Sequence, residues 1–365
     1  MVDFILNAIY IAGLIIGIFL MWKIPSFKQR NDSQVSDEAI SILIPARNEE
    51  KRIEPLLASI KANHFKGELI VIDDESTDQT AAIAKRYGAT VITSKPLPKG
   101  WRGKSWALYQ GKEAAQHETL MLLDADTVFD TGGIQKIIAA YQAANAPISV
   151  QPYHAMKQPY EQLSAIFNVV ILMASNLYTP FQDRLKPRVF YGPVQMMSKS
   201  DYARVEKNKN VNQSVLDDIE MGKVFLEEGR PIKSYVGTGA ISFRMYPGGF
   251  KESVLGWSKS FATGAILIGA LNMTLISLWL TSIYGAFVRP LLMSDPTWVQ
   301  ALLYLAAGAE LFWMARRAGN FSVLTILLFP LHALYFLWVF ITSLMNTLFK
   351  KRVNWRGRDI DLGDE

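Results

Sequence analysis

The sequence contains no cysteine, and this absence excludes several kinds of site at once. Disulfides, thiolate metal sites, iron–sulfur clusters and cysteine nucleophiles all require that residue. The four histidines, His64, His117, His154 and His332, share no metal-binding spacing, so we expect them to be structural. Charged residues make up only 19% of the chain and hydrophobic residues make up 50%, which excludes a disordered protein, because disordered chains are poor in apolar side chains.

Two glycine-rich phosphate-binding motifs are also missing. No G-x-G-x-x-G follows the first predicted strand, so a dinucleotide-dependent oxidoreductase is not expected. The GKS fragment at 103–105 lacks the upstream glycine of a P-loop. The formal charge of +5 does not by itself indicate nucleic acid, because Lys and Arg beside membrane spans give the same excess.

An uncharged apolar run at 4–22 predicts an N-terminal membrane anchor. At ~1.5 Å per residue it is long enough to cross a ~30 Å hydrocarbon core. Asp3 precedes the run and Lys23, Lys28 and Arg30 follow it, so the positive-inside rule places the N-terminus outside and residue 23 onward in the cytoplasm. The alternative, a cleaved signal peptide, would have basic residues before the run.

Three further apolar runs, at 262–288, 298–314 and 321–349, predict a C-terminal membrane bundle. Three crossings would place the basic tail outside, which conflicts with the positive-inside rule, so one run is a candidate for a re-entrant or interfacial segment. Glu310 and His332 lie at membrane depth, where ionisable groups are often functional; the alternative is that each faces another helix or an interface.

The central part of the chain reads as a water-soluble α/β domain. Short apolar runs alternate with longer helical patterns, which predicts βαβ units and a buried, mostly parallel sheet. The expected strands lie at 40–46, 68–74, 90–94, 119–124 and 148–153, and the expected helices at 47–63, 76–87, 104–117, 132–144 and 217–228. We therefore expect an anchor at 1–23, a catalytic domain at 38–260, a membrane bundle at 261–349 and a basic tail at 350–365.

Acidic side chains lie at the ends of three of the predicted strands, at Glu49, Asp73-Asp74 and Asp124-Asp126. Ligands of such sheets collect at the carboxyl ends of the strands, so these residues describe one site. Asp124 and Asp126 could converge on Mg²⁺ or Mn²⁺, which prefer oxygen ligands. Asp73 and Asp74 could accept hydrogen bonds from a nucleoside, or could serve as turn and helix-capping residues.

Two other charged segments fit the same site. Lys99, Arg102 and Lys104 form a compact basic loop suited to a diphosphate, with a solvated basic turn as the alternative. Asp217 and Asp218 begin a predicted helix, where the helix dipole favours anions. A carboxylate held there in a partly desolvated cleft is a plausible general base, although helix capping would explain one of the two.

Taken in order, these residues resemble the inverting glycosyltransferases of family 2, which have the GT-A fold. The matching segments, within about 38–265, are 45–49 (PARNE), 73–78 (DDESTD), 124–126 (DAD), 192–193 (GP) and 217–218 (DD). The segments 100–107 (GWRGKSWA), 256–259 (GWSK) and 354–358 (NWRGR) are similar to the carotenoid-acid, hopanoid and ceramide-type lipid members. Processive members carry Q-x-x-R-W, but here Ser253 to Gly256 precede Trp257, which favours a single transfer.

The resemblance implies a role for each matching residue. Pro45, Ala46, Glu49, Asp73 and Asp74 would hold the nucleoside, Lys104 and Asp124 the diphosphate, Asp126 and Asp124 the metal, and Gly192 and Trp257 the acceptor. Asp218 would be the catalytic base, with Asp217 beside it.

The activity implied is transfer of a hexose, glucose from UDP-glucose, to a lipid, with Mg²⁺ or Mn²⁺ as cofactor. The implied acceptor is a C30 carotenoid acid, which also implies association with other carotenoid-pathway enzymes at the cell membrane; a hopanoid, ceramide or diacylglycerol hydroxyl is the alternative. A glycoside hydrolase and a transporter or scaffold are the rival classes. The apolar stretch 160–181 either lies in the membrane interface and guides the lipid, or is an ordinary buried helix.

Overall fold

The structure is a computed structural model, in which the chain forms two compact units. The residues described are 2–23, 27, 36–181, 189–206, 208, 211–212, 214, 217–259, 261, 264, 268–292, 296–346, 352–355 and 358–361. The sheet unit comprises Pro25–His154 and Pro187–Arg244. The helical unit comprises Met1–Ile24, Ala155–Lys186 and Met245–Glu365.

The sheet unit is built on a seven-stranded sheet of order β3-β2-β1-β4-β8-β6-β9. Its strands are β1 (Ile40–Ala46), β2 (Glu68–Asp73), β3 (Thr90–Thr93), β4 (Thr119–Leu123), β6 (Ile148–Gln151), β8 (Val194–Ser198) and β9 (Lys233–Val236). All neighbouring strands pair parallel except β8, which is antiparallel to both β4 and β6. The predicted mixed α/β fold with a mostly parallel sheet is therefore confirmed, while β8 and β9 were not among the expected strands.

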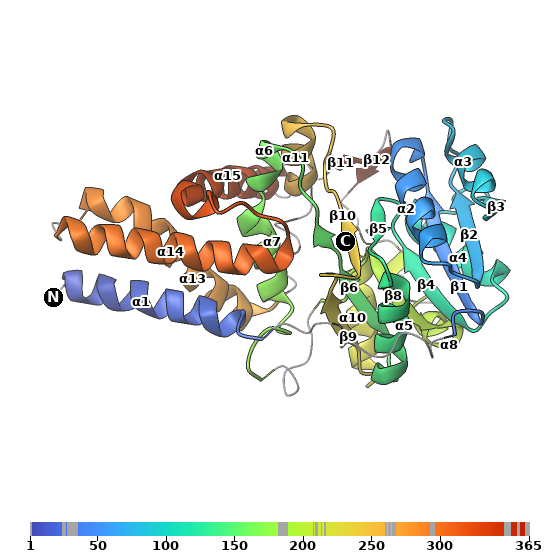
Figure 1. Ribbon diagram of the computed structural model, residues 1–365, viewed down its shortest axis with the longest axis horizontal. Helices are drawn as coiled ribbons and strands as arrows, with labels where there is room; N and C mark the ends of the chain where they lie inside the picture. The colour runs from blue at the N-terminus through green and yellow to red at the C-terminus, as the bar shows by residue number, and fades with distance from the viewer. Residues whose placement is uncertain are drawn as a thin grey trace. The chain divides into compact units, whose positions relative to one another are not determined.

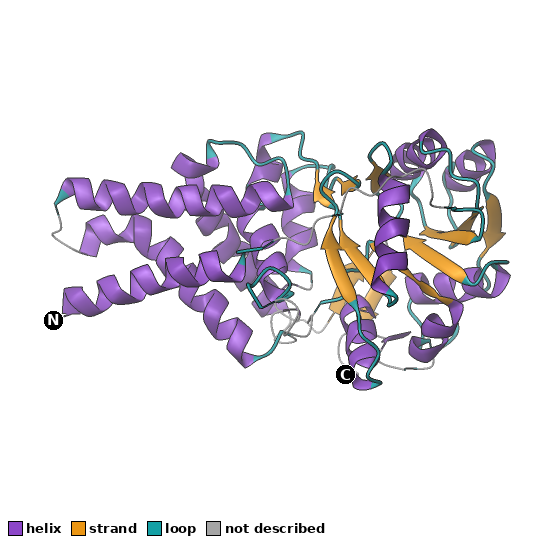
Figure 2. Cartoon of the chain, turned by 60° about the horizontal axis from the view of Figure 1, so that its bottom comes forward, coloured by secondary structure: helices purple, strands orange, loops and turns teal. Residues whose placement is uncertain are grey.

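Helices cover both faces of this sheet, and Figure 2 shows its strands lying between them. One face packs against α2 (Glu50–Ala62), α3 (Thr80–Arg86) and α5 (Gly133–Ala144). The other face packs against α4 (Gly103–Ala114), α8 (Lys199–Val205) and α10 (Asp217–Glu227). Along β1, Ile42 and Ile44 point into the first core and Leu43 into the second, as the two-residue period of a strand requires.

Several expected boundaries were wrong, and two of the differences have a clear local reason. The predicted helix from residue 47 begins only at Glu50, because Asn48 takes a left-handed conformation with φ 52°. The predicted strand 148–153 is split at Pro152, which has no N–H to donate to a strand ladder. The chain beyond it forms β7 (Tyr153–His154) in a small sheet of order β5-β10-β7, with β5 at Thr127–Phe129 and β10 at Ile241–Phe243.

The helical unit gathers the apolar segments of the chain (Figure 1). Its long helices are α1 (Val2–Leu20), α13 (Ala270–Leu292), α14 (Thr297–Ala318) and α15 (Thr325–Met345). By length and composition, α13, α14 and α15 could each cross a membrane, and α1 packs along α13. Glu310 and His332 are both buried, at 9% and 4% exposure, so each faces the interior of this unit.

Shorter elements complete the helical unit. They are α6 (Pro159–Gln162), α7 (Ala165–Ala174), α11 (Phe250–Ser258) and a hairpin of β11 (Arg352–Trp355) and β12 (Arg358–Asp361). Almost every residue of α7 is buried, and the helix contacts α13, α14 and α15. Of the two alternatives for the stretch 160–181, the structure therefore favours the buried helix.

Candidate active site

The acidic segments that follow β1, β2 and β4 lie at one edge of the sheet. The three strands are parallel neighbours, and the register pairs Ala46 at the end of β1 with Asp73 at the end of β2. Parallel strands place their carboxyl ends at the same edge, where ligands of such sheets bind. The sequence-based expectation that Glu49, Asp73 and Asp124 share one edge is met.

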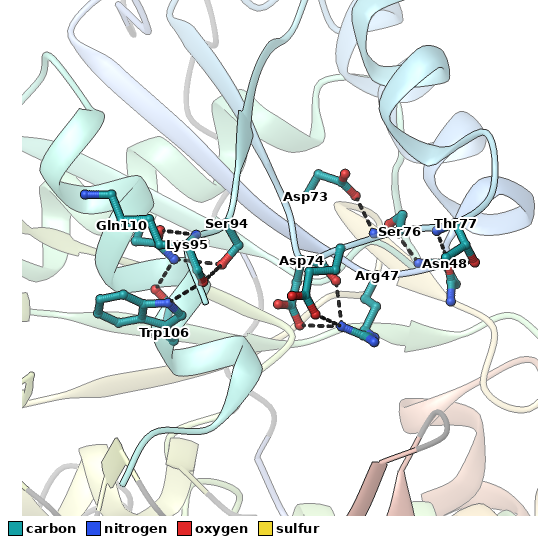
Figure 3. Close-up of polar contacts among 11 residues, drawn as sticks. Arg47, Asn48, Asp73, Asp74, Ser76, Thr77, Ser94, Lys95, Trp106 and Gln110 are labelled. Carbon is teal, nitrogen blue, oxygen red and sulfur yellow. Dashed lines mark hydrogen bonds and ion pairs between the residues drawn. The ribbon is translucent and has the colours of Figure 1, made fainter. Parts of the chain in front are cut away.

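The loops after β1 and β2 are tied to each other by side-chain hydrogen bonds (Figure 3). Asn48 Oδ1 accepts a hydrogen bond from the Thr77 backbone N–H at 2.8 Å, and the Asn48 backbone N–H donates to Ser76 Oγ at 3.0 Å. Arg47 Nη1 donates to the Asp74 carbonyl at 2.8 Å and lies 3.5 Å from its carboxylate. These bonds join the loop after β1 to the loop after β2.

Asp73 and Asp74 do not cap α3. The Asp73 carboxylate accepts the Ser76 amide at 3.3 Å, which is turn chemistry, and the Asp74 amide donates to the Ala46 carbonyl at 2.8 Å. The helix itself begins later, at Thr80. Pro45 is half-buried and Ala46 is buried beside this turn.

Lys104 and Asp124 form a close ion pair. The Lys104 Nζ lies 2.6 Å from Asp124 Oδ1, and Lys104 is the second residue of α4. The backbone of Asp124 is held on both sides, because its amide donates to the Pro193 carbonyl at 2.9 Å and its carbonyl accepts the Thr127 hydroxyl at 2.9 Å. Of the predicted basic loop, Lys104 reaches the acidic residues, whereas Lys99 is exposed.

Asp126 lies close to other negative charges. Burial, followed by the charges of Asp124 and Glu49, raises the pKa of Asp126 to about 6, although Arg52 and Lys104 oppose the shift. Among the described residues, none lies within hydrogen-bonding or ion-pairing distance of the Asp126 carboxylate. A half-buried carboxylate that other carboxylates surround is a good ligand for a hard cation.

Asp217 and Asp218 begin α10, as predicted. Asp217 accepts the Ser105 hydroxyl at 3.3 Å and the Asp218 amide at 3.0 Å. Asp218 accepts the Gly192 amide at 3.0 Å on one carboxylate oxygen and the Ile219 amide at 3.0 Å on the other. These bonds fix the orientation of both carboxylates.

The electrostatics of this pair depend on Lys104. Burial, followed by the charge of Asp217, raises the pKa of Asp218 to about 7, while Lys104 acts in the opposite direction. Burial also raises the pKa of Asp217. Burial alone would lower the pKa of Lys104, but the surrounding carboxylates, Asp124 first, raise it above its ordinary value. One ammonium group therefore lies among the acidic residues of two different segments.

Gly192 and Trp257, the two predicted acceptor residues, belong to different units. A Cβ on Gly192 would lie only 3.0 Å from Asp218 Oδ2, so the glycine allows the carboxylate to approach the backbone. The residue before it is anchored by a buried bond, in which the Tyr191 amide donates to Ser149 Oγ at 2.9 Å. Trp257 lies buried in α11 of the helical unit, where its ring stacks on Phe167 at 4.7 Å.

Two residues with contacts to this site were not predicted. Ser105 donates to Asp217, and Arg52 lies 3.6 Å from Glu49, one of the charges that act on Asp126. Ser105 follows Lys104 directly in the sequence, and that adjacency is the signal that could have identified it. Arg52 gave no such signal, because a basic residue three positions after Glu49 on a helix is common.

This arrangement combines the Lys104 ammonium group, several carboxylates and, at Asp218, a carboxylate whose pKa burial and the charge of Asp217 raise to about 7. Comparison with known proteins decides the family. Residues 41–205 match the family Glycosyl transferase family 2. The chain is 33% identical over 346 residues to 4,4'-diaponeurosporenoate glycosyltransferase of Staphylococcus haemolyticus, with 92% of each protein covered, and 35% identical over 336 residues to the protein of that name from Staphylococcus aureus strain USA300, with 90% of each covered.

The chain belongs to glycosyltransferase family 2. The predicted likeness to the carotenoid-acid members of the family is confirmed, and membership of the family decides against the hydrolase and transporter alternatives. The solved mannosyltransferase PcManGT from Pyrobaculum calidifontis, in complex with GDP-Man and Mn²⁺, shares the fold, with a TM-score of 0.59, 15% identity, and coverage of 96% of this chain and 100% of that one.

The family-2 match covers only part of the site. It includes the ends of β1, β2 and β4 with Lys104, but it stops before Asp217 and Asp218. The hydrogen bonds from Ser105 and Gly192 connect those two aspartates to the matched region.

Proposed function

We propose that this glycosyltransferase moves glucose from UDP-glucose to the carboxylate of a C30 carotenoid acid and forms a glycosyl ester. The observation that carries the proposal is the ion pair between Lys104 and Asp124, together with the charges of Asp217 and Asp218, which act on the same ammonium group. The names of the two relatives, which cover nine-tenths of the chain, support a carotenoid acid as acceptor.

The donor binds along the edge of the sheet. Pro45, Ala46, Glu49, Asp73 and Asp74 hold the nucleoside, and Asp124 and Lys104 meet the diphosphate. The Lys104 ammonium then exchanges the Asp124 carboxylate for phosphate oxygens, which are the stronger partners for a point charge when the diphosphate leaves. Because Lys104 follows the first residue of α4, the positive end of that helix dipole acts in the same direction.

We propose Asp126 and Asp124 as the ligands of Mg²⁺ or Mn²⁺. Within the described residues no group of three or more His, Asp or Glu could hold a metal alone. Mg²⁺ does not need three ligands from the protein, because it is commonly held by one or two carboxylates plus substrate phosphates. When bound, the metal would neutralise charge that develops on the leaving diphosphate.

The reaction is a direct displacement with inversion. An acceptor oxygen forms a bond to the anomeric carbon of the sugar, and the bond from that carbon to the phosphate oxygen breaks, so that UDP leaves with the electron pair. A hydroxyl acceptor gives its proton to Asp218. A carboxylic acid acceptor is already ionised near neutral pH, because unperturbed carboxyl groups titrate near ~4, so Asp218 then orients the acceptor and takes no proton.

A hydroxyl lipid, such as a hopanoid, ceramide or diacylglycerol, is the second candidate acceptor. It is favoured by the pKa of about 7 at Asp218, which suits a general base for an alcohol. The substitution Asp218→Asn removes the base while it keeps the shape of the side chain. We expect this variant to lose nearly all transfer to a hydroxyl acceptor, by about 10²–10⁴-fold, and to keep part of its transfer to a carboxylate.

Product formation by wild type and Asp218→Asn, with a carotenoid acid and a carotenoid alcohol of matched length, measures this difference. Asp73→Asn is the control, because loss of a nucleoside contact should slow both reactions alike. Equal and complete loss of both reactions in Asp218→Asn would argue against the proposed division of roles.

We further propose that the enzyme is a multi-pass protein of the cell membrane. Residues 1–23 form an anchor with the N-terminus outside, 38–260 form the cytoplasmic catalytic domain, 261–349 form the membrane bundle and 350–365 form a basic tail. The apolar helices α13, α14 and α15 support the proposal, as do the basic residues that follow α1. Enzymes that make the carotenoid acid in the same membrane are the partners we expect.

A further inference from the structure

A row of aromatic rings runs through the helical unit from its surface to a buried tryptophan; we call it the aromatic ladder. It consists of Trp338, Phe250, Tyr335, Phe167 and Trp257. The ring of Phe250 is stacked on that of Trp338, with 6.1 Å between the ring centroids, and its centroid lies 5.7 Å from that of Tyr335. Tyr335 meets Phe167 edge-on at 5.9 Å, and Phe167 stacks on Trp257 at 4.7 Å. These spacings are those of favourable aromatic pairs, so the ladder is continuous.

The two rings at the outer end of the ladder are exposed, and hydrogen bonds hold the segments that carry them. Trp338 is 51% exposed and Phe250 is 41% exposed. The turn before α11 is fixed, because the Gly249 amide donates to the Tyr160 hydroxyl at 3.1 Å. Helix α11 is also tied to α15 by a 2.8 Å hydrogen bond between the Ser253 and Tyr335 hydroxyls. An exposed ring pair that is already ordered loses little conformational entropy when it binds a ligand.

The inner end of the ladder carries a polar group that needs a partner. Trp257 is only 4% exposed, and its indole Nε1 has no hydrogen-bond acceptor among the described residues. A buried N–H group without an acceptor is costly, and native proteins rarely leave one unpaired.

We propose that the aromatic ladder binds the apolar body of the lipid acceptor, with Phe250 and Trp338 as the rings on which it stacks. The inference rests on the proposed function and specifies its acceptor as a planar, conjugated chain. The flat faces of aromatic rings offer a planar conjugated chain a large area for stacking contact. The exposed end of the ladder continues the outer side of α15, where Leu331 and Leu334 are 52% and 53% exposed, as expected for a surface that faces lipid.

Substitution of the two exposed rings by leucine tests the proposal, because leucine keeps the surface apolar and removes only the flat ring. We expect Phe250→Leu and Trp338→Leu each to raise the KM for a long polyene acid about two- to tenfold, which is the range for loss of one aromatic pair. The effect should fall on KM and not on kcat, and it should vanish with a short-chain acid that carries the same carboxylate. Trp298→Leu is the matched control, because Trp298 is 70% exposed on α14 and lies outside the ladder.

If all three variants behave alike, the rings act only as membrane-interface anchors and the proposal is wrong. It is also wrong if the loss is equal for the long and the short acid. Retention of a C30 polyene acid by the purified full-length protein, measured from its visible absorbance, gives an answer that does not need turnover. If the wild type makes no ester but retains the polyene through Phe250 and Trp338, the proposed function fails while the binding surface stands.

Discussion

Asp218 is the residue whose environment best suits the role of a general base. Its carboxylate is held by the amides of Gly192 and Ile219, and its pKa is raised to about 7. A base must be ionised to accept a proton, so a raised pKa means that activity is lost as the pH falls through this value. We therefore expect kcat/KM with a hydroxyl acceptor to fall about tenfold for each pH unit below 7 and to level off above it.

The pH–rate profile of the wild type with a hydroxyl acceptor measures this fall in kcat/KM below pH 7, which is the acidic limb of the profile. A carboxylate acceptor provides the control, because it needs no base in this pH range and should give a flatter profile. Persistence of the same acidic limb in the residual activity of Asp218→Asn would contradict the assignment of that limb to Asp218.

Asp73 is the last residue of β2, whereas Asp126 follows β4 and experiences the charges of Asp124 and Glu49. If Asp126 is a metal ligand, Asp126→Asn should weaken Mn²⁺ binding in the presence of UDP by at least about tenfold, or ~1.4 kcal/mol. Titration calorimetry of the purified protein measures this without turnover. Asp73→Asn should leave the Mn²⁺ affinity nearly unchanged, and an equal loss in the two variants would refute the assignment.

At this scale the sequence predicted which residues carry charge near the site, but not how they pair. Asp124 and Asp126 could be identified because they follow a buried apolar run. Their relation to Lys104 could not, since α4 and β4 are joined in space by packing and not by any local pattern. The bond from Ser105 to Asp217 spans more than a hundred residues of sequence, and nothing in the local chemistry of either residue predicts it.

Among the helices and strands, the local sequence pattern identifies some strands and misses others. The strands β1, β2 and β4 are continuous runs of buried-type residues, and periodicity identifies them. Strand β8 (VQMMS) has weak strand character of its own, and its place between β4 and β6 is fixed by long-range pairing. The small sheet of β5, β10 and β7 consists of two or three residues per strand, which is too short for any pattern.

Helix α1 depends on two glycines, four residues apart, for its contact with the other apolar helices. A Cβ on Gly17 would lie 2.3 Å from Glu310 Oε1 and 2.3 Å from the Trp279 ring, and one on Gly13 would meet Ser282. Small residues at this spacing allow helix backbones to approach closely in membranes.

We expect Gly17→Ala to destabilise the protein. In an open helix the exchange would gain about 1 kcal/mol in helix propensity. Here Trp279 is fully buried and cannot move aside, so overpacking of about 1–3 kcal/mol should outweigh the gain. Thermal unfolding of the detergent-solubilised protein measures the change, with Ile15→Ala, at a 60% exposed position of the same helix, as the control. A higher midpoint for Gly17→Ala would show that α1 does not pack as described.

At the scale of the whole molecule, sequence order and spatial grouping differ. Composition predicted apolar segments at both ends of the chain with a soluble region between them. The helical unit also includes Ala155–Lys186, which interrupts the sheet unit in the sequence. The apolar character of α7 gave a hint, but a helix buried in a soluble core has the same composition as one buried among membrane helices. Its partners could therefore not be read from the sequence.

We propose that the sheet unit, through its carboxylates, transfers a sugar from a nucleotide donor to a carotenoid acid. The most direct test is mass and NMR analysis of the product that membranes containing the full-length chain form from UDP-glucose, Mn²⁺ and a C30 carotenoid acid. We expect a glucosyl ester whose anomeric configuration is opposite to that of the donor, and no ester with Asp126→Asn. Retention of the donor configuration, or glucose attached only to hydroxyl lipids while the acid stays unmodified, would contradict it.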